Sequence, residues 1–242
     1  MISADKAEHK QIIITNVADV RRRIAVAAHR AGRNPAAITF MAVTKTQPAG
    51  KIVACYAAGI RSFGENRIQE FATKREQLGE LNGATFTLIG HLQSNKTNKA
   101  VELFSEIHSV ESLRLAERIN AAVERSGKSP MPIAVEINTG DPAKAGLAPD
   151  SPELEQLLQS AECLPHISIQ GLMTIPPFTE NPEDVRPYFR RLRQLRDSIA
   201  ARELPAVGME LLSMGMSHDF EVAIEEGSTC VRIGTAIFGE RS

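Results

Sequence analysis

The sequence contains no tryptophan, only two tyrosines and only three cysteines among 242 residues. The cysteines are far apart, form no CxxC pair and are odd in number, at Cys55, Cys163 and Cys230. They exclude a disulfide framework, favour a reducing compartment and suggest no metal site. The N-terminal segment lacks an apolar stretch of signal-peptide length, and no run approaches the roughly 20 apolar residues of a membrane span. We therefore predict a cytoplasmic protein.

The chain also lacks an excess of charge of either sign, because 28 basic residues stand against 29 acidic ones, a formal net charge of -1. No overall field thus favours nucleic acid or a membrane surface. Arginines cluster at 21–23 and 186–196, but they alternate with apolar helix positions, and no base-stacking aromatic residues accompany them. Nucleic-acid binding is disfavoured, and the length suits one large domain or two small ones.

Short apolar runs alternate with longer helical patterns. The runs that predict strands are ITFMAV (38–43), IRSFG (60–64), TFTLIG (85–90), EIHSV (106–110), PIAVEIN (132–138), ISIQGLM (167–173), MELLS (209–213) and TCVRIG (229–234). Such alternation favours parallel strands. About eight units of this kind predict an α/β fold, a (β/α)8 TIM-type barrel that forms one domain over residues 1–242. An extra helix at roughly 5–32 precedes the first strand, and a doubly wound open sheet is the alternative.

The first apolar run leads directly to a lysine, Lys45, at its carboxyl end. Burial of a lysine disfavours the ammonium and lowers the pKa, so the neutral amine becomes a nucleophile. Such an amine forms Schiff bases with aldehydes and ketones. The alternative is an amphipathic lysine whose ammonium reaches the surface.

Polar residues follow nearly every predicted strand. In a parallel barrel the carboxyl ends of the strands share one face, which carries the working loops. This face would gather Lys45, Glu65, Asn66, His91, Gln93, Ser94, Asn95, Ser109, Asn138, Thr174, Ser213, Ser217, Gly234 and Thr235. Each alone is explained by a turn or a helix cap, but their repetition indicates a binding site.

Two loops of this face suggest an anion. SMGMS places Ser213, Gly215 and Ser217 before a predicted helix, and Gly234 and Thr235 precede a short last turn. Small residues let backbone N–H groups approach a phosphate, and barrels often bind phosphate with the loops after strands 7 and 8. The alternative is that Ser217 only caps a helix. A reactive lysine and a phosphate site on one face indicate a phosphorylated aldehyde.

Strand alternation in TCVRIG places Cys230, Arg232 and Gly234 on one face. If this face looks into the barrel, the arginine needs an acceptor, because an unpaired buried charge is costly. A pyridine nitrogen is a suitable acceptor. Because arginine stays protonated, it would donate to that nitrogen and weaken the ring as an electron sink.

Seven motifs, in matching order from about residue 38 to 241, resemble the pyridoxal 5′-phosphate homeostasis proteins (the YggS/PROSC family). They are AVTKTQP, FGENRIQE, IGHLQSNK, HSVES, GLMTI, LSMGMSHDFEVAIEEGST and VRIGTAIFGER. The resemblance implies a barrel of the alanine-racemase type, fold type III among pyridoxal phosphate proteins. It implies pyridoxal 5′-phosphate as the cofactor, bound as a Schiff base on Lys45.

The resemblance also implies roles for the other site residues. The phosphate would be bound by Ser213, Gly234 and Thr235. Arg232 would face the pyridine nitrogen, Asn66 and His91 would line the pocket, and Met214 would lie near the ring. The chain departs from the family pattern at FTLIG (86–90), where WHFIG is usual, at Arg67, where an aromatic residue is common, and at His218, often acidic. These departures concern the pocket wall rather than the lysine or the phosphate loops.

The resemblance implies a carrier or regulator of pyridoxal phosphate supply, with apo forms of pyridoxal phosphate enzymes as recipients and no established turnover. A carrier needs only reversible imine exchange, and Lys144 is a candidate relay amine. We expect a monomer.

Two enzymatic alternatives remain open. A racemase needs a second acid–base group opposite the lysine. The related racemases use a tyrosine from an extra domain of a partner subunit, whereas Tyr56 and Tyr188 fall in helical segments here. His91 or His218 would have to substitute. A class I aldolase would also use a barrel lysine and a phosphate site, but it would carry no chromophore.

Overall fold

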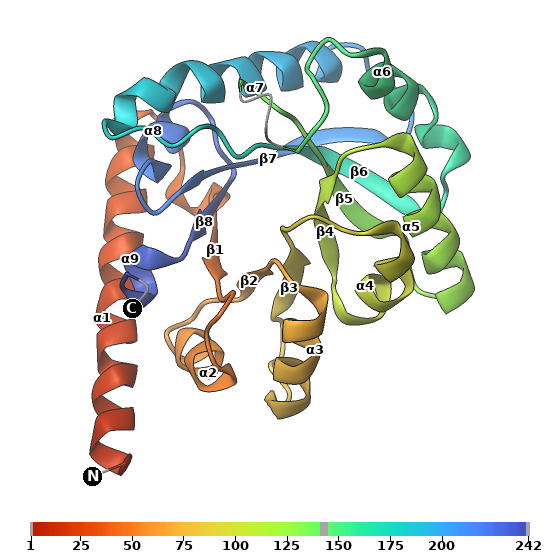
Figure 1. Ribbon diagram of the computed structural model, residues 1–242. Coiled ribbons are helices and arrows are strands. Elements are labelled where there is room, and N and C mark those ends of the chain that lie inside the picture. Colours follow the sequence, from red (N-terminus) through yellow and green to blue (C-terminus); the bar gives the residue numbers. More distant parts are fainter. Residues whose placement is uncertain (1, 141–144, 241–242) are drawn as a thin grey trace.

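A computed structural model shows eight parallel strands that close into a barrel, with β8 paired to β1 (Figure 1). It describes residues 2–140 and 145–240, with side chains from residue 10 onward. The strands are β1 (Thr39–Val43), β2 (Ser62–Glu65), β3 (Thr85–Leu88), β4 (Glu106–Val110), β5 (Met131–Glu136), β6 (Ile167–Met173), β7 (Val207–Met216) and β8 (Cys230–Ile233). The predicted (β/α)8 barrel is confirmed, and the open doubly wound sheet is excluded because the first and last strands pair.

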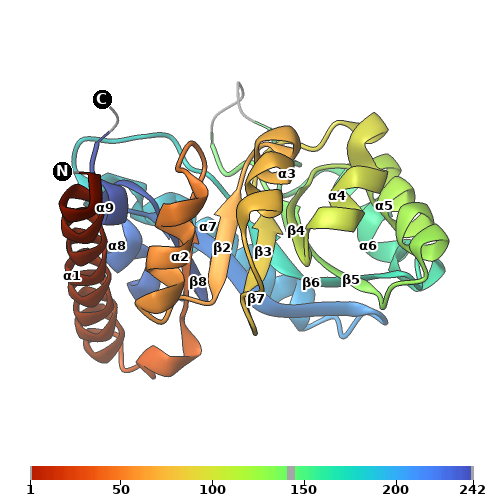
Figure 2. The ribbon, with the colours of Figure 1, turned by 90° about the horizontal axis from the view of Figure 1, so that it is seen from below.

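Helices cover the outside of the barrel (Figures 1 and 2). They are α1 (Ile2–Arg30), α2 (Ala49–Ala57), α3 (Ile68–Gln77), α4 (Thr97–Leu103), α5 (Leu113–Ser126), α6 (Pro152–Gln159), α7 (Arg186–Ala200), α8 (Phe220–Glu225) and α9 (Thr235–Phe238). None of the helices in the described ranges is long and apolar enough to cross a membrane.

The helix α1 is the extra N-terminal helix that the sequence predicts, and it lies against the last helices of the chain (Figure 2). Its buried stripe comprises Ile13, Val17, Val20 and Ile24, at helical spacing. At the far end of the sequence, the carbonyl oxygen of Ile237 accepts a 2.8 Å hydrogen bond from Asn16 Nδ2. The two ends of the chain therefore stabilise each other across one side of the barrel.

The strands and helices follow from local sequence. Ile133, Ala134 and Val135 of β5 are all fully buried, as expected of a parallel strand covered on both faces. In α5, the Ser112 hydroxyl accepts the N–H of Leu115 at the start, and Gly127, with a φ of 64°, ends the helix. Both are residue types that the backbone favours at helix ends.

Strand β7 is longer than predicted. The sequence indicates a strand over 209–213 with SMGMS in the following loop, but β7 continues to Met216, which pairs with Arg232 of β8. Gly215 permits this with a φ of 93°, and a Cβ there would lie 2.5 Å from the Cβ of Ala223. Because Gly lacks a side chain, α8 packs directly on the end of β7.

Four phenylalanines fix α3 against β2 and β3. Phe63 stacks on Phe86 with ring centroids 5.3 Å apart, and Phe71 of α3 lies 4.8 Å from Phe86. Phe104 completes the row, 4.9 Å from Phe71. Aromatic pairs at these separations add stabilisation beyond their buried area. They set the position of α3, whose polar side chains reach the turn after β1.

Candidate functional site

Lys45 lies at the carboxyl end of the barrel, in a turn rather than on a strand. The strand β1 ends at Val43, and the side chain of Lys45 is half-buried. Lys45 is thus partly buried, which lies between the buried amine and the surface-reaching lysine that the sequence leaves open. The turn after Thr44 places Lys45 at the barrel mouth, where the residue is partly exposed to solvent.

The turn that contains Lys45 is fixed by a buried ion cluster. The ammonium of Lys74, on α3, donates to both carboxylate oxygens of Glu65, at 2.8 and 3.0 Å. It also pairs with Glu70 at 2.6 Å and donates to the carbonyl oxygen of Thr44 at 2.8 Å. The Thr44 hydroxyl donates to Glu65 as well. The residue before Lys45 is thus bonded through both its side chain and its backbone.

The cluster has opposite effects on its two carboxyl groups. Burial raises the pKa of Glu65, against hydrogen bonds from Lys74 and Thr44. Burial also pushes the pKa of Glu70 upward, but hydrogen bonds from Lys74 and the Thr46 N–H outweigh it, so that pKa is lowered. The bond to Thr46 is short, at 2.6 Å, and Thr46 has a φ of 65°, a region that costs energy for a β-branched residue. Glu70 therefore helps to hold the turn in a strained form.

Asn66 follows β2, the strand beside β1, at the same end of the barrel. Its Oδ1 is buried and accepts no hydrogen bond from the described part of the protein. The backbone of Asn66 is pressed against Gly90, where a Cβ would lie 2.5 Å from the Asn66 carbonyl oxygen. Buried acceptors are nearly always bonded, so this amide oxygen needs a donor from a ligand or water.

Arg232 reaches across the interior of the barrel from β8. Its Nη1 donates to the carbonyl oxygen of Ser213 at 2.6 Å and to the Ser213 hydroxyl at 2.9 Å. Its Nη2 donates to the carbonyl oxygen of Thr174 at 2.7 Å. Burial lowers its pKa, with Cys230, Glu136 and Asp219 opposing. The inward orientation considered from strand alternation is confirmed, and protein acceptors meet part of the arginine's hydrogen-bonding need.

Ser217 links the ends of β7 and β8. Its hydroxyl oxygen accepts the backbone N–H of Gly234 at 3.1 Å and of Ala236 at 3.2 Å. Asp219, not Ser217, precedes α8, and its carboxylate accepts the N–H of Met216. Converging backbone N–H groups are typical of sites that bind a phosphate oxygen. These bonds lie at the start of α9 rather than α8, so the alternative that Ser217 caps a helix stays open beside the anion site.

A carboxyl group that the sequence analysis missed lies at this mouth. Glu136 ends β5, and only 7% of it is exposed. Burial and then the charge of Glu111 raise its pKa to about 7, against Arg232 and His91. His91 lies on the open side of the mouth, 59% exposed, with Nδ1 at 2.9 Å from Glu111. The barrel mouth therefore contains a carboxyl group, Glu136, whose pKa is close to neutral pH.

The structure brings most predicted site residues to one end of the barrel. Met214 is fully buried on β7, and Thr235 is exposed at the start of α9. The Ser213 hydroxyl accepts from Arg232, so its predicted phosphate contact remains a prediction. Lys144 lies outside the described residues.

Three features of the site were not identified from the sequence. The Glu65–Lys74 pair is nine residues apart in sequence, and FGENRIQEFATK shows only a helix of mixed charge. Glu136 is a charged residue at the end of an otherwise apolar strand, and this contrast could have indicated a site residue. Ser217 appeared in the SMGMS motif, but its partners Gly234 and Ala236 come from another strand end.

Comparison with known proteins decides the family. A sequence model described as "Alanine racemase, N-terminal domain" matches residues 15–242. The pyridoxal phosphate homeostasis protein of Aquifex aeolicus is 45% identical over 225 residues, which is 92% of this chain and 95% of that protein. The chain belongs to the family of pyridoxal phosphate homeostasis proteins. The member from Escherichia coli K12 is 41% identical over 95% of this chain and 97% of its own length.

Solved structures agree with this family. PipY of Synechococcus elongatus, solved with pyridoxal phosphate bound, superimposes with a TM-score of 0.80 at 37% identity, covering 94% of this chain and all of PipY. Alanine racemase of Clostridium difficile gives a TM-score of 0.70 at 15% identity, over 94% of this chain and 57% of the racemase. At that identity the racemase shows a shared fold only. This homeostasis-family barrel is therefore of the alanine-racemase type.

Proposed function

We propose that this protein binds pyridoxal 5′-phosphate at the carboxyl end of the barrel, with its aldehyde held on Lys45 as a Schiff base. Three features meet at that end: the Lys45 turn, the buried and unbonded Oδ1 of Asn66, and the Ser217 hydroxyl that faces two backbone N–H groups. They provide an amine, a polar contact and an anion site. PipY, which is similar over its whole length, was solved with the same ligand.

The residues at this end offer a polar partner for each part of the group. A phosphate would be bound at Gly234 and Ser217, with Thr235 and Ser213 as the further candidates from the family pattern. Arg232 lies buried beside Ser213 and would face the pyridine nitrogen as a donor. Met214 and His91 would line the remaining walls. When bound, pyridoxal phosphate supplies an electrophilic aldehyde and an electron sink.

The chain's own residues would control exchange at Lys45. Lys45 would supply the amine that holds the aldehyde, with one water released on binding; water would free the aldehyde again, or an incoming amine would take it over and free the lysine. The Glu65–Lys74–Glu70 cluster fixes the turn that carries the amine. Glu136, with a pKa near neutrality, can accept or return a proton at the mouth. The half-exposed turn leaves the lysine accessible to an incoming amine.

This accessibility supports a carrier or regulator of pyridoxal phosphate supply, with apo-enzymes as recipients. A racemase would need an acid–base group facing the lysine from the other side of the ring. Tyr56, on α2, donates to the carbonyl oxygen of Asn82, before β3 and away from the mouth, and Tyr188, at the start of α7, packs against Gly140 of the loop after β5. The relay role of Lys144, the monomeric state and the cytoplasmic location remain predictions.

The first experiment tests the bond. Protein incubated with pyridoxal phosphate should develop a visible absorbance band that borohydride removes. Lys45→Ala should lose the band, whereas Lys99→Ala, an exposed lysine on α4, should keep it. A full band in Lys45→Ala would disprove the assignment. A protein that processes a phosphorylated aldehyde substrate but retains no chromophore would instead be an aldolase.

The second experiment tests the carrier role. Loaded protein is mixed with the apo form of a pyridoxal phosphate enzyme in the presence of a trap for the free cofactor. Recovery of enzyme activity despite the trap supports direct transfer. Steady isomerisation of an amino acid by the purified protein would instead establish the racemase alternative.

A further inference from the structure

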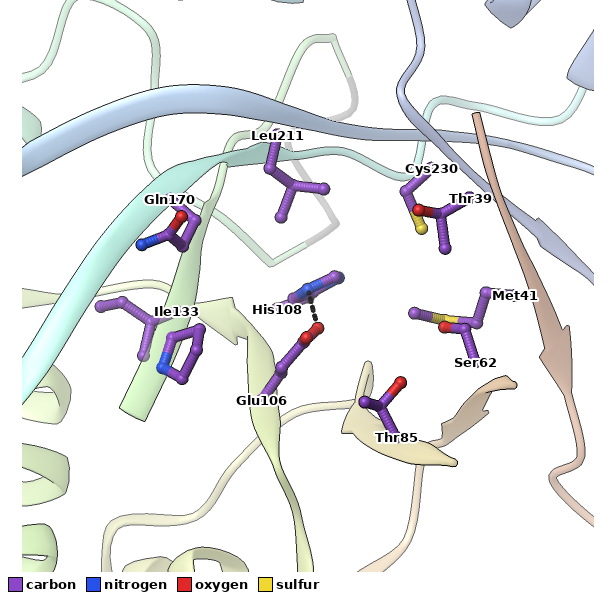
Figure 3. A pocket seen from close by; sticks show the side chains of 11 residues that line it. Thr39, Met41, Ser62, Thr85, Glu106, His108, Ile133, Gln170, Leu211 and Cys230 are labelled. Carbon is purple, nitrogen blue, oxygen red and sulfur yellow. Dashed lines mark hydrogen bonds and ion pairs between the residues drawn. The ribbon is translucent and has the colours of Figure 1, made fainter. Parts of the chain in front are cut away.

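A cavity of about 400 Å³ lies at the end of the barrel opposite Lys45. Figure 3 shows the side chains that line it. Its wall includes the first residues of three strands, Thr39 of β1, Thr85 of β3 and Glu106 of β4. In a parallel barrel these residues mark the amino end, away from the working loops. The proposed cofactor residues do not line it, so this cavity is separate from the pyridoxal phosphate site.

The cavity contains a buried histidine with an unused ring nitrogen. His108 is 3% exposed, and its ring projects among the lining side chains in Figure 3. Its Nε2 lies 3.1 Å from Oε2 of Glu106, while its Nδ1 is buried and has no hydrogen-bond partner. Buried polar atoms are rarely left unbonded, so this atom points to a missing partner.

The charge of the wall selects the kind of partner. A hydrogen bond from His108 lowers the pKa of Glu106, so this carboxyl group is ionised at neutral pH. Because Glu106 takes the hydrogen of Nε2, a neutral imidazole leaves Nδ1 as an acceptor. No lysine or arginine is among the described residues that line the cavity. The Glu106 carboxylate would repel an anion such as phosphate, and no described cationic side chain of the wall would offset this.

The remaining wall offers more acceptors and a small apolar surface. The amide nitrogen of Gln170 donates to Ser168, which leaves the Gln170 carbonyl oxygen available. Ser62, Thr39 and Thr85 add hydroxyl groups. Apolar side chains complete the wall, namely Met41, Ile133 and Leu211. The cavity volume is within the range of about 300–1,000 Å³ that is usual for small-molecule sites.

We propose that this amino-end cavity binds a small organic cation of the guanidinium or ammonium type. Its N–H groups donate to the Glu106 carboxylate, to His108 Nδ1 and to the strand-start hydroxyls, and its short alkyl part contacts the apolar wall. The site is independent of Lys45, since the two lie at opposite ends of the barrel.

Ethylguanidinium is a suitable probe because it carries no primary alkylamine to condense with pyridoxal phosphate. Titration into the full-length protein, loaded or free, is followed by calorimetry and by the ¹⁵N signals of the His108 ring. We expect saturable shifts with a Kd on the order of 1 mM. Ethylurea, the neutral isostere, should bind at least about tenfold more weakly, because a hydrogen bond to a charged group is the stronger kind. Butanoate should not bind.

Variants locate the site. Glu106→Gln keeps the shape of the side chain and should weaken ethylguanidinium binding at least about tenfold. Glu102→Gln, which removes an exposed carboxylate of an ion pair on α4, is the matched control and should leave the affinity unchanged. If Glu106→Gln does not fold, Thr85→Ile fills the cavity instead and should remove the His108 shifts. Absence of saturable shifts in the wild type, equal binding of ethylurea, or unchanged affinity in folded Glu106→Gln would overturn the proposal.

Discussion

The ammonium of Lys74 donates a 2.8 Å hydrogen bond to the carbonyl oxygen of Thr44, the residue immediately before Lys45. The same ammonium pairs with Glu65 of β2 and Glu70 of α3. The position of the proposed reactive lysine therefore depends on a second lysine, which is almost fully buried. The buried ammonium can fix the Lys45 turn only while its partners balance its charge, because an uncompensated buried charge is destabilising.

We expect Lys74→Met to destabilise the fold by about 3–5 kcal/mol, because Glu65 would be left buried without its cation. The variant should also bind pyridoxal phosphate more weakly, since the turn of Lys45 loses its bond at Thr44. Urea denaturation and cofactor titration measure the two effects. The matched change Lys99→Met, at an exposed ion pair, should alter stability by no more than about 0.5 kcal/mol. Unchanged cofactor affinity in folded Lys74→Met would remove the positioning role.

Ser217→Ala should weaken binding of pyridoxal phosphate about tenfold and leave binding of unphosphorylated pyridoxal unchanged. The reason is that its hydroxyl oxygen accepts the Gly234 and Ala236 N–H groups at the proposed phosphate position, where the hydroxyl itself would donate to a phosphate oxygen. Fluorescence or absorbance titration with both vitamers gives the ratio. Ser213→Ala is the comparison, because it removes the bond to Arg232 instead. If only Ser213→Ala lost the preference for the phosphorylated vitamer, Ser213 would be the phosphate residue.

Glu136→Gln should stabilise the protein at pH 8 and have little effect at pH 4. Burial raises the pKa of Glu136 to about 7, so the folded state retains a proton that the unfolded state releases at a lower pH. Stability is therefore lost as pH rises from about 4.3, the unfolded value, through the folded pKa, and the loss is complete above it. The gain at pH 8 should be on the order of 3–4 kcal/mol.

Urea denaturation at both pH values measures this effect. Glu76→Gln, at an exposed position of α3, is the control and should show no such pH dependence. A constant difference between wild type and Glu136→Gln across the range would contradict the raised pKa.

Gly215→Ala should destabilise the fold by about 2 kcal/mol or more, because the residue has a φ of 93° and a Cβ would lie 2.5 Å from that of Ala223. Gly79→Ala, where a Cβ meets no atom within 4 Å and φ is not positive, should change stability by less than about 1 kcal/mol. Thermal unfolding of both variants gives the comparison. A tolerated Gly215→Ala would show that α8 can move away from the end of β7.

Much of the fold could be predicted because its signals are local. Runs such as ITFMAV and PIAVEIN show that a strand is covered on both faces, and the spacing of Leu115, Ile119 and Val123 shows a helix against the sheet. The length of β7 was missed because its last residues pair with β8 after a register shift between Ser213 and Met216, and the glycine-containing motif SMGMS is typical of a loop.

The sequence by itself determined the alternation of strands and helices, the position of Lys45 after the first strand and the motifs that indicate the family. Local hydrophobic periodicity and residue type are enough for these. Only the tertiary structure decided that Lys74 fixes the Lys45 turn, that Ser217 faces the N–H groups of Gly234 and Ala236, and that His108 has an unbonded nitrogen in a cavity at the other end. Each of these depends on side chains from different strands or helices meeting inside or around a closed barrel. The distances and burial that set their hydrogen bonds and pKa values exist only after closure.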